Sequence, residues 1–172
     1  MRVVEAVVSA ALAGVAALAL GANPALVSAL AVAAVAPPLT RVDRAEHRLP
    51  NRLVLPALAA GAFSLGVSWL VSGRPPLVPL LAAASYAGVL LVCALFGGMG
   101  MGDVKLAAAL GLAAPTIAVA VLSSLLAFLL GGVAAVFVLI RRGPGARIAF
   151  GPFLLAGYFG ALIAVAVARV LA

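Results

Sequence analysis

The stretch Phe96-Gly-Gly-Met-Gly-Met-Gly-Asp-Val-Lys-Leu106 divides the sequence, because the chain on both sides of it is largely apolar. Four glycines fall at positions 97, 98, 100 and 102, and the carboxylate of Asp103 follows them at once. The whole chain has only four acidic residues. Asp103 is the one that adjoins a glycine-rich break between two hydrophobic runs. A carboxylate at membrane depth is costly, so its position there indicates a functional site.

The composition is that of an integral membrane protein. Hydrophobic residues make up 67% of the 172 residues and the mean hydropathy is +1.34. Charged residues make up 9%, against roughly 25% in soluble domains. Spans of about 20 residues fit several times into this length and leave no room for a separate soluble domain. We therefore predict an all-α, polytopic membrane protein with six or seven transmembrane helices.

The hydrophobic runs lie at about 3–20, 24–39, 53–72, 77–96, 104–115, 116–140 and 150–171. Asn23-Pro24 predicts a tight helical hairpin between the first two runs. Pro37-Pro38 predicts the end of the second run, and the polar residues 40–52 then form a loop. The run 104–115 is short for a full span, so a tilted or partly re-entrant helix is expected. We expect one membrane domain over 1–172, with a core at 24–171 and an additional helix at 3–20.

Basic residues predict the orientation in the membrane. If residues 40–52 face the cytoplasm, alternate crossings place 97–105 and 141–149 on the same side, together with nine of the eleven lysines and arginines. The other side then holds only Arg74 and Arg169. This asymmetry follows the positive-inside rule and accounts for the net charge of +7. We therefore expect contacts with membrane lipid, no nucleic-acid partner, and a multi-pass protein of the cell membrane with Asp43 and Asp103 at its cytoplasmic face.

Two carboxylates at one membrane face suit peptide hydrolysis. Asp43 opens the predicted polar loop, and Asp103 opens the short run after the glycines. If they lie close together, both cannot ionise cheaply and they share one proton. One carboxylate can then activate a water while the other, protonated, polarises the scissile carbonyl. Gly100 and Gly102 would let an extended substrate approach the backbone closely, whereas Gly97-Gly98 fits helix packing equally well.

Three segments carry a resemblance to a known family. Gly100-Met-Gly-Asp-Val-Lys-Leu106 looks like the GxGD signature of the type IV prepilin peptidases. Asp43-Arg-Ala-Glu-His-Arg-Leu-Pro-Asn51 resembles the first aspartate motif of that family, in which an aspartate leads into Ile-Pro-Asn. Arg147-Ile-Ala-Phe-Gly-Pro-Phe153 is similar to its Ile-Pro-Phe-Gly-Pro stretch. The three segments keep the order that they have in the family.

The resemblance implies a membrane aspartic endopeptidase that removes short basic leader peptides from pilin-like precursor proteins. It implies catalytic roles for Asp43 and Asp103. Residues implied to bind substrate or shape the site are Gly100, Met101, Gly102, Lys105, Pro50, Asn51, Gly151 and Pro152. Ala149 replaces a proline of the third motif, and Leu49 replaces an isoleucine. With a single cysteine, Cys93, the chain resembles small members without the cysteine-rich methylating domain of larger relatives.

Other interpretations remain open from the residues alone. Lys105 could lower the pKa of the nearby acid or contact substrate, or it could anchor the chain at the interface. A non-enzymatic scaffold or a small transporter with two independent aspartates is one alternative function. A presenilin-like intramembrane protease is another, although Val42 stands where those enzymes have tyrosine and Asp43 is predicted to open a loop. Two acids without His or Cys partners predict no metal site, and no cofactor is expected.

Overall fold

The computed structural model describes residues 2–96, 99–143 and 148–171, and every regular element within them is an α-helix. These elements are α1 (Arg2–Leu20), α2 (Ala25–Glu46), α3 (Asn51–Ser72), α4 (Leu77–Leu95), α5 (Met101–Leu112), α6 (Ile117–Arg142) and α7 (Gly151–Leu171). Six of them, all except α5, are long and apolar enough to cross a membrane. The predicted all-α polytopic fold is confirmed.

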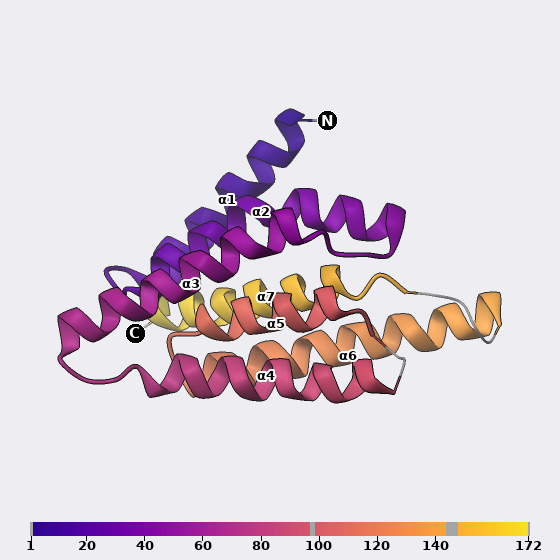
Figure 1. Cartoon of the computed structure of the whole chain (residues 1–172). Helices are drawn as coiled ribbons and strands as arrows, with labels where there is room; N and C mark the ends of the chain where they lie inside the picture. The colour runs from indigo at the N-terminus through magenta and orange to yellow at the C-terminus, as the bar shows by residue number, and fades with distance from the viewer. Residues whose placement is uncertain (1, 97–98, 144–147, 172) are drawn as a thin grey trace.

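The short helix α5 lies inside the bundle (Figure 1), where it contacts α2, α3, α4 and α7. It has 12 residues, about 18 Å of helix, which is shorter than the hydrocarbon core of a bilayer. Half of its side chains are buried, including Leu106 and Leu110. The expectation of a short segment after Asp103 is therefore confirmed, and other helices of the chain enclose it.

Small residues let the helices approach each other closely. Gly111 of α5 lies against the backbone of Ala82 and Ala83 in α4, where a Cβ atom would not fit. Gly157 of α7 lies in the same way against the backbone of α6 at Ser123 and Ala127. Close backbone packing of this kind is a main source of helix association in lipid.

The second helix corrects one expectation from the sequence. Pro37 and Pro38 do not end it: α2 continues through them to Glu46. Each proline removes one intrahelical hydrogen bond, but membrane helices tolerate this where neighbouring helices hold them. Here one face of α2, including Ala36, Leu39 and Asp43, is buried against the bundle. Tertiary packing therefore extends the helix into the segment expected to be a loop, and Asp43 lies in its last turn.

Six helix ends lie toward one end of the bundle. The ends of α2, α4 and α6 and the starts of α3, α5 and α7 all lie on the right of Figure 1. The connections at residues 21–24, 73–76 and 113–116 lie at the other end. Two long helices, α3 and α4, lie between the two aspartates in the chain, which agrees with the expected even number of crossings. Asp43 and Asp103 consequently lie at the same end of the bundle.

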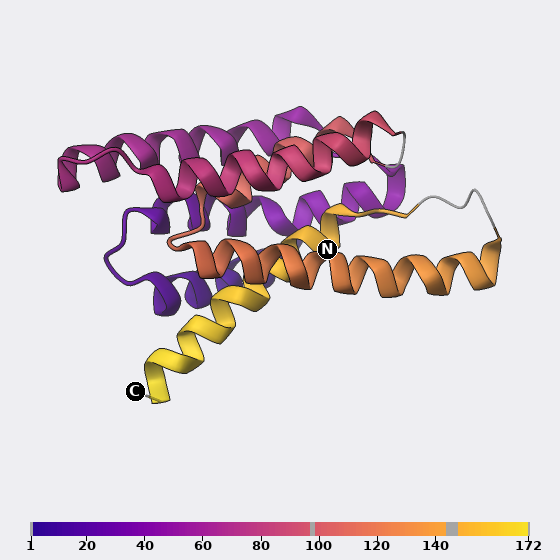
Figure 2. The same ribbon diagram turned by 90° about the horizontal axis from the view of Figure 1, so that it is seen from below.

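The outer parts of the first and last helices leave the bundle. The buried residues of α1 are Ala16, Ala19 and Leu20, at its C-terminal end, while the part near Val3 and Val7 is exposed. The first half of α1 diverges from the other helices in Figure 1, and the C-terminal part of α7 does so in Figure 2. The first half of α1 still contacts α2 near the aspartates, since Glu5 pairs with Arg41 at 2.9 Å. The C-terminal part of α7 lies at the opposite end of the bundle.

Candidate active site

Asp43 is held by a contact between the end of α2 and the start of α7. Its side chain is only 3% exposed. The backbone N–H of Gly151, the first residue of α7, donates a hydrogen bond to Asp43 Oδ2 at 2.9 Å. After Asp43, the helix closes at His47, which has φ of 50° and donates its backbone N–H to the carbonyl of Asp43 at 2.8 Å. Hydrogen bonding from an amide stabilises the ionised form of a carboxylate.

Asp103 is fixed in the first turn of α5. Its Oδ2 accepts a hydrogen bond from the backbone N–H of Gly100 at 3.2 Å, and its own N–H donates to the Gly100 carbonyl at 3.0 Å. A carboxylate at this position is favoured by the positive end of the helix dipole. The other oxygen, Oδ1, is buried and has no hydrogen-bond partner among the described residues. One oxygen of Asp103 therefore orients the side chain, and the other has no partner among the described residues.

The two acids influence each other electrostatically. Burial raises the pKa of Asp103 from 3.8 to about 6, and the nearby charge of Asp43 adds to this, while the hydrogen bond from Gly100 opposes it. A like charge nearby disfavours ionisation of the second carboxyl group. Asp103 therefore stays protonated to a higher pH than a free aspartic acid does.

Leu49 links the surroundings of the two acids. It is buried, although it belongs to an otherwise polar segment. Its Cβ and main chain lie against Gly102, where an added Cβ would be 2.7 Å from Leu49 Cβ and 3.0 Å from the Leu49 carbonyl oxygen. Its side chain reaches Gly151, where an added Cβ would be 3.0 Å from Leu49 Cδ2 and 2.8 Å from Asp43 Oδ2. Glycine at both positions therefore allows α5 and α7 to approach Leu49 with one acid on each side.

Lys105 has a partner that the sequence did not indicate. Its Nζ donates a hydrogen bond to Asn51 Oδ1 at 3.0 Å. Asn51 is the first residue of α3, and Pro50 before it forms the N-terminal boundary with φ of −71°. Lys105 thus ties α5 to the start of α3, and the predicted site residues Pro50, Asn51 and Lys105 are brought together beside Leu49.

The remaining predicted site residues lie in different surroundings. Met101 is 55% exposed at the start of α5 and turns away from the packed interior. Pro152 lines a neighbouring hollow with Arg44. Gly97, Gly98 and the first residue of the third motif, Arg147, lie outside the described residues.

Sequence reasoning missed the contacts of Leu49, which it noted only as a replacement of isoleucine. The available signal was an apolar side chain inside a polar segment. It also missed that Arg44, directly after Asp43, lies near Arg142 of α6. No pattern in the sequence could indicate that both line one hollow, because 98 positions separate the two arginines.

Comparison with known proteins gave one match. A model described as the type IV leader peptidase family matches residues 30–140. This range covers more than half of the chain and contains both aspartates. No curated protein and no solved structure matches the chain.

Proposed function

The chain belongs to the type IV leader peptidase family, and from this membership we propose that it is an aspartic endopeptidase which removes the leader peptide of pilin-like precursors. We assign the catalytic roles to Asp43 and Asp103. The observation that carries the proposal is the convergence of these two acids, from α2 and α5, at one end of the bundle, where the charge of Asp43 helps to raise the pKa of Asp103.

The surroundings of the two acids support different roles. Asp43 accepts the Gly151 N–H at 2.9 Å, a shorter bond than the 3.2 Å bond from Gly100 to Asp103, so we assign it the role of general base. Asp103, with its raised pKa and unpartnered Oδ1, is the better proton donor.

In the proposed reaction, Asp43 removes a proton from a water molecule whose oxygen attacks the scissile carbonyl carbon. Asp103 gives its proton to the carbonyl oxygen, which forms a neutral tetrahedral diol. Asp43, now protonated, then gives its proton to the leaving nitrogen as the C–N bond breaks. Asp103 recovers its proton from the diol as the new carboxyl group forms. Both acids thus return to their starting states.

The charge distribution supports an active site at the cytoplasmic face. The end of the bundle that holds the aspartates also holds the basic ends of α2 and α6, with Arg44, Arg141 and Arg142. Short cytoplasmic loops of membrane proteins collect such residues. A leader peptide that lies on the cytoplasmic side of its own membrane segment would reach this end directly.

The test is cleavage of a panel of leader-bearing pilin-like precursors by the full-length protein in liposomes. Asp43→Asn and Asp103→Asn should each lower the cleavage rate by about 10²–10⁴-fold, the usual contribution of a general acid or base. Glu46→Gln is the matched control, because Glu46 lies in the same last turn as Asp43 but pairs with Arg48 at the surface. Membrane insertion of each variant is checked by its extraction with detergent but not with carbonate.

Near-normal cleavage by either aspartate variant would refute the catalytic pair. If wild type cuts none of the precursors while it binds them, the protease assignment within this substrate class fails. In that case the scaffold or transporter interpretation, with two independent aspartates, gains support.

A further inference from the structure

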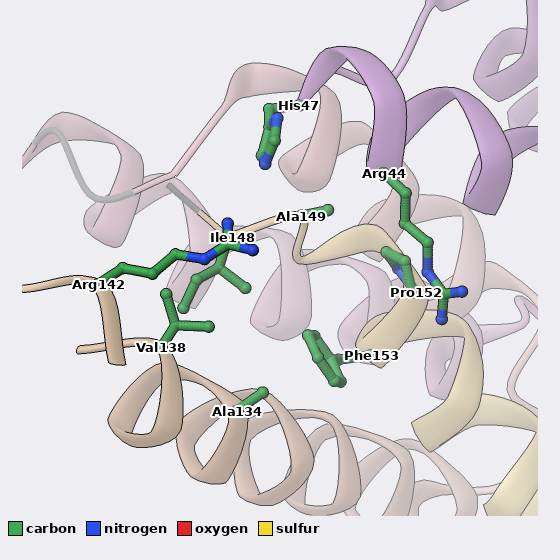
Figure 3. Close-up of a pocket in the computed structure, with 9 residues that line it drawn as sticks. All are labelled: Arg44, His47, Ala134, Val138, Arg142, Ile148, Ala149, Pro152 and Phe153. Atoms are coloured by element: carbon green, nitrogen blue, oxygen red, sulfur yellow. The ribbon is translucent and has the colours of Figure 1, made fainter. Parts of the chain in front are cut away.

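A basic hollow lies beside the aspartates, between the end of α2, the end of α6 and the start of α7. Its volume is about 240 Å³. Arg44 and Arg142 lie on opposite sides of it and His47 lies above, as Figure 3 shows. Ala134, Val138 and Phe153 form its lower wall (Figure 3). The hollow therefore has a cationic rim and an apolar floor.

Among the described residues, no acidic side chain forms an ion pair with Arg44 or Arg142. The sequence has four side-chain carboxylates, and the structure describes all of them. Glu5 pairs with Arg41 and Glu46 pairs with Arg48. Asp43 and Asp103 accept backbone hydrogen bonds at the buried site. The guanidinium groups at the hollow are therefore available to an anionic group from outside the chain.

The shape and position of the hollow define that group. Two guanidinium groups on different helices suit the oxygen atoms of a phosphate, which arginine binds with several N–H donors. The apolar floor belongs partly to α6, a candidate membrane span whose Phe137 and Ile140 are exposed nearby. A soluble anion would gain nothing from such a floor, whereas an acyl chain would.

We propose that this hollow is a binding site for an anionic phospholipid, with the headgroup phosphate between Arg44 and Arg142 and the start of an acyl chain along Ala134, Val138 and Phe153. The site does not include the proposed catalytic pair, since neither Asp43 nor Asp103 lines the hollow. A bound lipid would hold the ends of α2 and α6 together beside the start of α7.

The experiment titrates the full chain in neutral detergent micelles with phosphatidylglycerol and counts bound lipid by native mass spectrometry. The test variant is Arg44→Gln/Arg142→Gln. The matched control is Arg48→Gln/Arg141→Gln, which changes the net charge equally in the same two regions. Neither Arg48 nor Arg141 lines the hollow. Arg48 pairs with Glu46, and Arg141 stacks on Phe137.

A basic residue near an anionic lipid contributes about fivefold in binding, so the test variant should bind phosphatidylglycerol about 25-fold more weakly. The control variant should bind as wild type does, and phosphatidylcholine binding should be weak for all three proteins. Inorganic phosphate in large excess should not displace the lipid.

Three results would overturn the proposal. Equal losses in both double variants would show diffuse surface attraction rather than a site. Displacement by inorganic phosphate would show a site for a soluble anion. Unchanged lipid binding in the test variant, with a raised KM for a precursor, would assign the hollow to the substrate instead.

Discussion

The backbone N–H of Gly151 donates to Oδ2 of Asp43 at 2.9 Å across 108 positions of sequence. This bond joins the first residue of α7 to the last turn of α2. It leaves no room for a side chain on Gly151, because an added Cβ would lie 2.8 Å from the same carboxylate oxygen. The residue that holds Asp43 in place therefore has to be a glycine.

Gly151→Ala should displace the Asp43 carboxylate. Overpacking of this kind costs about 1–3 kcal/mol, and a small misplacement of a catalytic group can lower a rate by about 10²-fold. We expect a lower thermal midpoint in detergent and a cleavage rate lower by about 10²-fold. The control is Gly88→Ala in α4, where an added Cβ meets nothing within 4 Å. An active and equally stable Gly151→Ala variant would contradict the contact.

Gly102→Ala should destabilise the junction between α5 and the segment before α3. An added Cβ would lie 2.7 Å from Leu49 Cβ and 3.0 Å from the Leu49 carbonyl oxygen. We expect a loss of about 1–3 kcal/mol in the free energy of unfolding. Leu49→Ala should not rescue it, because alanine keeps both of these atoms. Rescue by Leu49→Ala would show that the longer side chain, and not the main chain, forms the contact.

The proposed cleavage should depend on pH through Asp103. Its pKa is raised to about 6, and its protonated form is the proposed acid. The value of kcat/KM should therefore fall about tenfold for each pH unit above this value in the free enzyme. A pH series of initial rates at low substrate concentration measures the effect. A rate that stays constant from acidic to mildly alkaline pH would exclude Asp103 as the acid.

The same residue should make stability depend on pH. Because the pKa of Asp103 is raised from 3.8 to about 6 in the folded protein, the folded state binds more protons than the unfolded state between these values. Its contribution to stability is present at low pH and is lost as the pH rises through about 6. Asp103→Asn should remove this dependence and raise the thermal midpoint at neutral pH by several degrees. An unchanged pH dependence in the variant would contradict the raised pKa.

Lys105 and Asn51 should act as a coupled pair. Their hydrogen bond of 3.0 Å joins α5 to α3 at an exposed position, and such bonds contribute about 0.5–1.5 kcal/mol. In a double-mutant cycle, Lys105→Met and Asn51→Ala should each destabilise, and the double variant should lose less than the sum. Additive losses would mean that Lys105 acts independently of Asn51, as an interfacial anchor or at the substrate.

The sequence by itself determined the fold class and the two candidate acids. Apolar runs of membrane length require helices, because backbone groups in lipid have no other partners. The scarcity of acids drew attention to Asp103 beside its glycines, and three ordered motifs added Asp43. The excess of basic residues predicted that both acids lie at one end of the bundle, which the structure bears out.

Only the tertiary structure decided how that end is built. The prolines at 37 and 38 predicted a helix end, but packing of the buried face of α2 carries the helix on to Glu46. The contact of Gly151 with Asp43, the position of Leu49 between two glycines, and the hollow between Arg44 and Arg142 all join segments far apart in the chain. Local sequence patterns report the preferences of neighbouring residues, whereas these contacts depend on which helices pack together and in which register.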